Sequence, residues 1–168
     1  MSYSYARINL DKTDYSKIGS SEVLLNPDPK QLNEIYYKYC HYHKFNSVMP
    51  LFDKDYYSND IFGYYDGDVL VAFSMISVYD DENAECVQFA WDYVNPKSQL
   101  GLKTLKHECA YYKEKGFKYL YIGGADEYKN KMDGLEVMSP VSWIEDRWTI
   151  DGFEKVPGMT WKELPISF

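Results

Sequence analysis

The stretch from Glu85 to Glu108 constrains the fold more than any other, because a strand, a sharp turn and a helix follow one another directly. Residues 86–94 are rich in β-branched and aromatic side chains, which are typical of a buried strand. Pro96 ends ladder pairing, and the polar residues after it form a loop. Apolar residues then recur at helical spacing, at Leu102, Leu105, Cys109 and Tyr112. The order predicts a strand that leads through a short loop into a helix.

The start of that helix is predicted to bind an anion. The first turn of a helix presents free backbone N–H groups at the positive end of the helix dipole. Lys103 and Lys106 fall in this turn, where cations are disfavoured, in a chain of net charge -8. An anionic ligand docked there would explain both lysines. The alternative is that both lysines extend into solvent, because an exposed charge at a helix end changes stability by only roughly 0.3–1 kcal/mol.

The same region resembles a known family. Residues 93–105 are similar to the fourth strand and pyrophosphate loop of the GCN5-related N-acetyltransferases (GNAT), in which a V-x-P-like strand end precedes a Q/R-x-x-G-x-G/A loop. Gln99 stands where that loop has Arg or Gln, but Gly101 lies one residue early and the other small positions do not match. The resemblance implies that an acyl-CoA donor, acetyl-CoA, contacts Tyr93, Val94, Gln99, Leu100, Gly101, Leu102, Lys103 and Thr104.

A second resemblance fits the single glycine better. Residues 99–103, the helix to Lys115, the segment 116–124 and the segment 129–132 are similar to the GNAT-like C-terminal half of the arginyl- and leucyl-tRNA-protein transferases. That pattern has a single-glycine loop, a helix, an aromatic strand and a downstream Lys-Met segment. It implies, as an alternative to a CoA donor, aminoacyl transfer from a charged tRNA.

Length and composition limit the classes to which the chain can belong. A chain of 168 residues with an apolar share of 45% suits a single globular domain, which we expect to span residues 1–168. There is no signal-like segment and no apolar run of membrane-spanning length, so we expect a cytoplasmic protein without a membrane partner. Cys40, Cys86 and Cys109 each lie alone in an apolar segment, and we expect reduced packing residues.

The acidic composition bears on the choice of partner. A pI near 4.9 argues against sequence-independent nucleic-acid binding, which depends on Lys and Arg. The only arginines are Arg7 and Arg147. A whole tRNA would normally require a basic face, so the charge opposes the aminoacyl-transfer alternative. A local basic patch would serve a CoA diphosphate or RNA equally well, and its candidate members are Lys97, Lys103, Lys106, Lys129 and Lys131.

Three further segments have clear patterns. Asp28 and Pro29 mark the start of a helix that is expected to run to about Phe45. Asp66-Gly67 is a hairpin-turn signal, and the strand after it is almost continuously apolar, as in a strand buried on both faces. Residues 46–60 are expected to form a short helix or ordered loop, a lid on the substrate side.

Together the elements predict an α/β (α+β) fold, namely a GNAT-like mixed central sheet with splayed parallel strands 4 and 5 and helices on both faces. Residues 86–94 and 117–122 are the predicted parallel pair, joined by the helix that Gly116 ends. Residues 4–10 are predicted to form an edge strand, and the C-terminal part a final antiparallel pair. In this fold the gap between the splayed strands receives the acyl donor.

The resemblance implies direct acyl transfer, in which an amine attacks a thioester carbonyl, a base removes a proton and an acid protonates the thiolate. Asp92, at the end of the predicted strand, is the leading candidate for the base, and Glu127 and Asp126 are second candidates. Tyr128 is the candidate acid, because a phenol with a pKa near 10 can donate to a thiolate. The alternative for Asp92 is a solvated carboxylate or a turn cap, and the alternative for Tyr128 is an ordinary surface tyrosine.

Other kinds of site lack the residues they need. His41 and His43 are two residues apart and cannot share a helix face, so no metal is expected. His107 is placed on the polar, solvated side of its helix. No hydrolase or nucleotide-hydrolysing motif is present. Three hypotheses therefore remain: an acyl-CoA-dependent N-acyltransferase acting on an amine, an aminoacyl-transferring enzyme, and a non-catalytic GNAT-like binding module.

Overall fold

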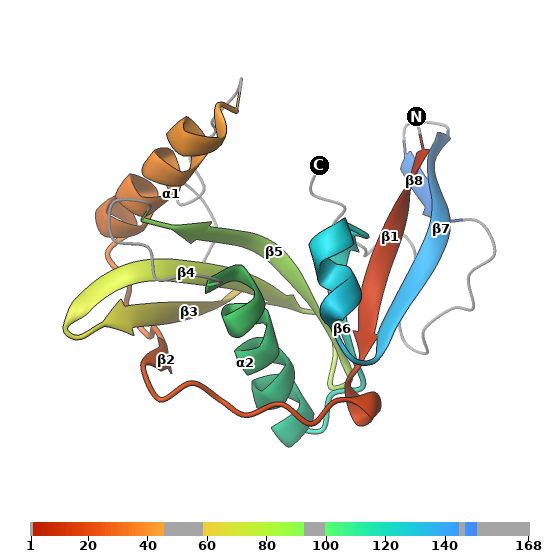
Figure 1. Ribbon diagram of the computed structural model, residues 1–168, viewed down its shortest axis with the longest axis horizontal. Coiled ribbons are helices and arrows are strands. Elements are labelled where there is room, and N and C mark those ends of the chain that lie inside the picture. The colour runs from red at the N-terminus through yellow and green to blue at the C-terminus, as the bar shows by residue number, and fades with distance from the viewer. Residues whose placement is uncertain (1, 46–58, 93–99, 145–146, 151–168) are drawn as a thin grey trace. The chain divides into compact units, whose positions relative to one another are not determined.

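The computed structural model describes residues 2–45, 59–92, 100–144 and 147–150 (Figure 1). Its helices are α1 (Pro29–His43) and α2 (Leu100–Glu114), with short 3₁₀ helices η1 (Leu10–Lys12) and η3 (Glu127–Lys131). Its strands are β1 (Ser2–Asn9), β2 (Ser21–Val23), β3 (Asn59–Asp66), β4 (Val69–Val78), β5 (Asn83–Trp91), β6 (Tyr119–Gly124), β7 (Leu135–Ile144) and β8 (Arg147–Ile150). Hydrogen bonds join them in the order β2-β3-β4-β5-β6-β1-β7-β8. The result is the mixed sheet that the sequence predicts.

The chain divides into two compact units. Unit 1 comprises Met1–Lys17, Val78–Val87 and Lys106–Phe168, and unit 2 comprises Ile18–Ser77 and Gln88–Leu105. β5 and α2 each contribute residues to both units. The single domain expected from the chain length stays a prediction.

Unit 1 contains the parallel strands. β5 and β6 pair in parallel over only three residue pairs, from Asn83 with Tyr119 to Glu85 with Tyr121. This pairing confirms that the two predicted strands run parallel. The paired residues of β5 lie just before the predicted range 86–94, because the strand begins at Asn83. Gly116 follows the last turn of α2 and has a φ of 91°, as predicted for the residue that ends this helix.

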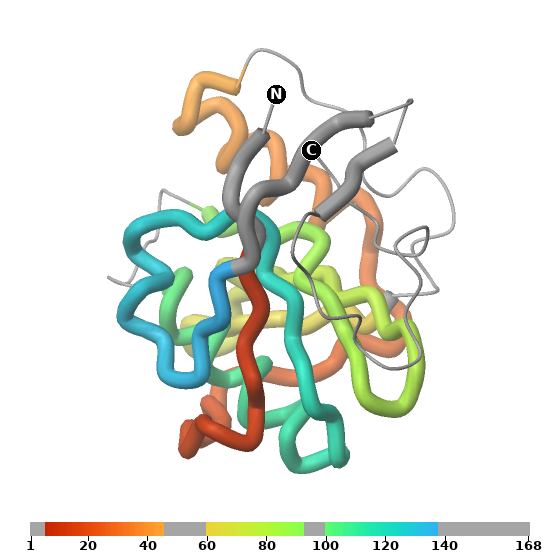
Figure 2. Tube along the Cα trace, turned by 90° about the vertical axis from the view of Figure 1, so that its right-hand side faces the viewer, coloured from red at the N-terminus to blue at the C-terminus, as the bar shows by residue number. Residues whose placement is uncertain are grey.

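The expectation that the first strand lies at a sheet edge is wrong. β1 pairs antiparallel with β6 on one side and with β7 on the other, and Figure 2 shows it, in red, between those two strands. Ala6 and Ile8 are fully buried on one of its faces. A short alternating pattern predicts a strand but does not reveal how many neighbours the strand has.

Gly134 leads into β7 with a φ of 71°, and a Cβ there would lie 2.4 Å from the backbone oxygen of Asn9.

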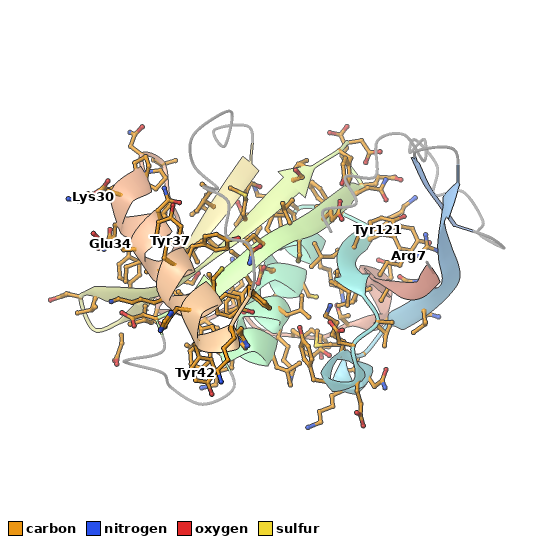
Figure 3. The ribbon with its side chains drawn as sticks, turned by 90° about the horizontal axis from the view of Figure 1, so that it is seen from above. Arg7, Lys30, Glu34, Tyr37, Tyr42 and Tyr121 are labelled. Atoms are coloured by element: carbon orange, nitrogen blue, oxygen red, sulfur yellow. The ribbon has the colours of Figure 1, made fainter. Side chains whose placement is uncertain are left out.

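Unit 2 contains α1 and the β3–β4 hairpin. The Asp28 carboxylate accepts a hydrogen bond from the Lys30 N–H, and Lys44 ends the helix in the left-handed conformation. The predicted start and end of α1 therefore lie close to the observed ones. Gly67 turns the hairpin with a φ of 62°, which confirms the Asp-Gly signal. All residues from Leu70 to Ile76 in β4 are buried, as predicted for a strand covered on both faces. Figure 3 shows the polar side chains along α1, including Lys30, Glu34, Tyr37 and Tyr42.

Candidate functional site

The start of α2, in unit 2, is one of two places with the features of a functional site. The helix begins at Leu100, two residues before the predicted start. Its first turn contains no Asp or Glu, although acidic residues are favoured at this positive pole. Lys103 is exposed in this turn. Of the predicted donor contacts, Leu100, Gly101, Leu102, Lys103 and Thr104 therefore lie together on one helix start. Tyr93, Val94 and Gln99 lie outside the described residues.

Gly101 has no packing reason to be a glycine. Its φ is not positive, and a Cβ built on it would have no described atom within 4 Å apart from its own helix neighbours. Glycine within a helix costs up to about 1 kcal/mol relative to alanine. A position that accepts this cost while facing open space is typical of a place where a ligand approaches the backbone closely.

The backbone of this turn is held from beneath. The Thr104 hydroxyl donates to the Gly101 carbonyl at 3.1 Å, and the Thr104 side chain is buried. The Tyr64 hydroxyl, on β3, donates to the Thr104 carbonyl at 3.4 Å. The Thr104 hydroxyl therefore bonds within the helix, and the donor contact that the resemblance implies for Thr104 stays a prediction.

Two candidate members of the predicted basic patch make contacts of their own, Lys97 lies outside the described residues, and the patch itself stays a prediction. Because α2 begins at Leu100, Lys106 lies in the second turn, and its ammonium lies 5.5 Å from the centre of the Tyr15 ring. Lys129 is 7% exposed, and its ammonium donates to the carbonyls of Ile122 and Gly124 at 2.7 Å and pairs with Asp126. Lys129 therefore fastens the end of β6. Among the described members of the patch, Lys103 is the one in the first turn of α2.

Asp92, the predicted base, lies in unit 2 just after β5. Its N–H donates to the Val71 carbonyl at 2.7 Å, and its carboxylate pairs with the Lys38 ammonium of α1 at 3.0 Å. The Asp92 side chain is largely buried. Any proton transfer to Asp92 must compete with this ion pair, and the catalytic role of Asp92 stays a prediction.

Tyr128 and Glu127, the other predicted catalytic residues, lie in unit 1 on η3 after β6. Tyr128 is half-exposed, and the Lys129 ammonium lies 5.6 Å from the centre of its ring. Glu127 is exposed in the first turn of η3. Both side chains are accessible to a substrate, and their roles also stay predictions.

The second place is a buried polar row in unit 1. Glu85 of β5 is in register with Tyr121 of β6, Tyr121 with Arg7 of β1, and Arg7 with Glu136 of β7. The Arg7 Nε donates to the Glu136 carboxylate at 2.7 Å, and its Nη1 donates to the Tyr121 hydroxyl at 3.3 Å. Figure 3 shows Arg7 and Tyr121 beside each other. We call Glu85, Tyr121, Arg7 and Glu136, with Tyr79, the polar row.

Glu85 is the most deeply buried carboxylate of this row, at 2% exposed. The Tyr79 hydroxyl donates a hydrogen bond to it. Burial, followed by the charge of Glu85, raises the pKa of the Tyr79 phenol well above its ordinary value, so the phenol keeps its proton. Glu85 and Tyr79 therefore form a carboxylate–phenol pair beside the point where the parallel pairing of β5 and β6 ends.

Charge and burial also shape the rest of the polar row. Burial raises the pKa of Tyr121 to about 12, against the lowering effect of the Arg7 guanidinium. Burial opposes the charge of Arg7, but its hydrogen bonds with Tyr121 and Glu136 outweigh this and raise the pKa of Arg7. The guanidinium also stacks 3.9 Å from the centre of the Tyr119 ring. The row thus combines charged groups with phenols that keep their protons.

Glu85 and Arg7 are functional candidates that the sequence patterns did not predict. Glu85 stood just before the segment predicted as the strand, and Arg7 was considered only as one of two arginines. The available signal was a charged residue inside an otherwise apolar, β-forming stretch, since such residues are rarely buried without a purpose. The register that joins them is a long-range property, which a single sequence does not display.

The prediction that His107 is solvated is wrong. His107 is 5% exposed, and burial, followed by the charge of Lys17, lowers its pKa. The polar face of α2 is covered by the segment before β2. Lys113 donates to the Thr13 carbonyl, Lys17 pairs with Glu114, and Tyr15 contacts Lys106.

Two further findings concern other classes of site. Among the described residues, no group of three or more His, Cys, Asp and Glu side chains is arranged to hold a metal ion. No helix in the described ranges has the length and hydropathy that crossing a membrane requires.

The three cysteines are free thiols, and burial raises the pKa of both Cys86 and Cys109.

No protein-family model matches the chain, and no curated protein matches it in sequence. Solved structures do match it in fold. L-PGS from Bacillus licheniformis superposes with a TM-score of 0.57 at 15% identity, over 73% of this chain and 46% of that one. The C-terminal domain of a protein named as a lysylphosphatidylglycerol synthetase, from Agrobacterium fabrum, has a TM-score of 0.54 at 11% identity, over 74% and 48%.

A GNAT-family structure from Novosphingobium aromaticivorans has a TM-score of 0.59 at 11% identity, over 83% of this chain and 62% of that one. The chain spans about half the length of the first two structures. At these identities the similarity concerns the fold. Together with the mixed sheet and its parallel β5–β6 pair, it shows that the chain has the fold of the GCN5-related N-acetyltransferases.

Proposed function

We propose that the protein is an N-acyltransferase that moves an acyl group from a CoA thioester, acetyl-CoA in the simplest case, to an amine. The observation that carries this proposal is the start of α2, where Gly101 faces open space and the first turn has no acidic residue. A helix start of this kind suits the diphosphate of CoA, because backbone N–H groups and the helix dipole both favour an anion. Lys103, exposed in the same turn, adds a positive charge.

Within unit 1, the polar row supplies a candidate acceptor for the proton of the amine. The amine nitrogen attacks the thioester carbonyl carbon, the carbon–sulfur bond breaks, and the nitrogen must lose a proton. The Tyr79 oxygen accepts that proton while its own hydrogen passes to the Glu85 carboxylate along the existing hydrogen bond. The raised pKa of Tyr79 supports this role, because the phenol always has a proton to pass on. Glu85 then returns the proton to solvent.

The sequence-based candidates remain part of the proposal. Tyr128 is proposed to protonate the departing thiolate, since it is half-exposed on η3. Asp92 and Glu127 are the competing candidates for the base. Asp92 would first have to leave its ion pair with Lys38, which favours Glu85.

Aminoacyl transfer is the second candidate. The name of one similar structure contains an aminoacyl product, lysylphosphatidylglycerol, which supports this alternative. A helix start that accepts a diphosphate would also accept a tRNA phosphate. Net charge -8 and the burial of Lys129 weigh against a large RNA surface.

The decisive experiment measures the melting temperature of the purified protein with CoA, acetyl-CoA, a charged tRNA or no addition. A donor that binds the folded state raises the melting temperature by mass action. We expect a rise with CoA and acetyl-CoA at millimolar concentration. A rise with the charged tRNA alone would transfer the assignment to aminoacyl transfer. No rise with any donor would favour the non-catalytic binding module.

A further inference from the structure

Arg7 is held in one orientation by three neighbours. Its Nε donates to Glu136 at 2.7 Å, its Nη1 donates to the Tyr121 hydroxyl at 3.3 Å, and its plane lies 3.9 Å from the centre of the Tyr119 ring. These contacts come from β7 and from two positions of β6, so the guanidinium is fixed by strands on both sides of β1. A guanidinium fixed in this way is preorganised to bind a ligand.

The contacts leave part of the guanidinium unused. An arginine carries five N–H donors, and the two hydrogen bonds above occupy one on Nε and one on Nη1. Within the described residues, the two N–H groups of Nη2 and the second one of Nη1 have no hydrogen-bond partner. The side chain is nevertheless only 12% exposed. No Arg7 nitrogen is among the described side-chain atoms that are both buried and without a partner, so these N–H groups keep access to solvent and can receive a ligand oxygen.

The surroundings of Arg7 select the kind of ligand. Glu136 is 31% exposed and uses one carboxylate oxygen for Arg7, so its second oxygen is available to an ammonium or amide N–H. Glu136 and Glu85 would repel a dianionic phosphate more than a single carboxylate. The planar N–H fork of arginine matches a carboxylate. The exposure increases along the polar row from Glu85 towards Glu136, so a ligand would enter at the Glu136 end.

We propose that Arg7 and Glu136 form a subsite for the carboxylate of the acceptor, which makes the acceptor an amino carboxylate: a free amino acid or an amine that bears a carboxylate. This inference rests on the proposed acyl transfer. Arg7 binds the carboxylate through its unused N–H groups on Nη1 and Nη2. Glu136 holds the guanidinium, and its second oxygen accepts a hydrogen bond from a second N–H group of the ligand. β1 lies two strands from β5, roughly 10 Å at ordinary strand spacing. Acceptors with several bonds between the carboxylate and the reacting amine, such as lysine, therefore fit best.

The test compares matched acceptors with the donor-free protein. Calorimetry measures the binding of lysine against 1,5-diaminopentane and of 6-aminohexanoate against hexylamine, pairs that differ by the carboxylate. We expect the carboxylated member to bind roughly 10- to 100-fold more tightly, as for loss of a charge-assisted fork. Arg7→Lys keeps the charge but loses the fork, and it should bring the ratio close to one.

Two controls keep the test decisive. Lys17→Met removes one positive charge from an exposed ion pair with Glu114 in the same unit, and it should leave the ratio unchanged. Glu136→Gln tests the subsite if Arg7→Lys does not fold, and it should reduce the preference for ligands with a second N–H group. Equal binding of both members of each pair by the folded wild-type protein would overturn the inference, as would a ratio that Arg7→Lys leaves intact.

The outcome separates this inference from the proposed function. A carboxylate preference without acyl transfer from any donor would keep the subsite and remove the acyltransferase. Acyl transfer to both members of each pair, with equal KM values, would keep the enzyme and remove the subsite.

Discussion

The polar row of unit 1 and the start of α2 in unit 2 are suited to binding by opposite means. In the polar row, charged side chains from neighbouring strands fix one another, as Arg7 is fixed by Glu136 and Tyr121. At the start of α2, Gly101 contributes no side chain and leaves the backbone open. The polar row should therefore lose its activity when a functional group is deleted. The start of α2 should lose ligand binding when atoms are added.

The largest effect is expected from the polar row. Glu85→Gln and Tyr79→Phe should each lower turnover on the order of 100- to 10,000-fold, because neither variant can pass the proton to a carboxylate. Donor affinity should remain, since unit 2 holds the proposed phosphate site. Steady-state kinetics and donor titrations measure the two quantities.

Asp92→Asn is the matched variant in the other unit. It should change turnover much less, since Asp92 is paired with Lys38. The reverse result, with a large loss for Asp92→Asn and a small one for Glu85→Gln in folded proteins, would return the base to Asp92. Circular dichroism of each variant shows whether folding has survived.

The next effect concerns Gly101. Gly101→Val should weaken CoA binding roughly 10- to 100-fold by occupying the space over the backbone N–H groups. Gly101→Ala should weaken it less and raise the stability of the free protein by up to about 1 kcal/mol, since no described atom obstructs the added methyl group.

Gly19→Val is the control, because Gly19 also lies in unit 2 and faces open space. CoA affinity measured by titration and stability measured by urea unfolding should change in opposite directions for Gly101→Ala. If Gly101→Val binds CoA as the wild type does, the diphosphate does not bind at the start of α2.

A smaller effect should separate the two lysines of α2. Lys103→Glu should lower CoA affinity several-fold, with a loss that shrinks as salt screens the charge. Lys106→Glu should have a weaker effect, because Lys106 lies one turn further along and contacts Tyr15. CoA titrations at low and high salt measure both. Equal losses for the two variants would contradict a phosphate site confined to the first turn.

The smallest effect is a pH dependence of stability. Burial, with the nearby charge of Lys17, lowers the pKa of His107 in the folded protein below its ordinary value of about 6.5. The unfolded chain therefore binds the proton more readily, and stability is full above about pH 6.5 and falls as the pH drops through the folded value. His107→Gln should flatten this dependence in urea unfolding between pH 7 and pH 5. An unchanged slope would show that other groups cause it.

The local elements of this fold could be predicted, because their signals lie within a few residues. Asp28 and Pro29 start α1, Asp66-Gly67 turns the hairpin, and Gly116 follows α2. The interior position of β1 could not, since pairing with β6 and β7 depends on residues more than a hundred positions away. Periodicity reports which face of a strand is apolar, but it does not report its neighbours.

The candidate site was only partly predictable for the same reason. The start of α2 follows from a contiguous strand, loop and helix. The polar row requires the register of four strands, so Glu85 and Arg7 gave no local signal beyond an unusual charge. Lys129 shows the opposite case. Its sequence context suggested a residue that binds a ligand, but its ammonium binds the carbonyls at the end of β6.

The path of the chain between the two units limits how they can be separated by a cut or a deletion. The chain passes from one unit to the other after Lys17, Ser77, Val87 and Leu105, and two of these passages lie inside β5 and α2. Because unit 1 contains both the first and the last segment of the sequence, any single cut divides it, although unit 2 stays whole after a cut at Lys17 or at Leu105. A proteolytic nick or a terminal deletion therefore cannot free the start of α2 from the polar row without dividing unit 1, which carries that row.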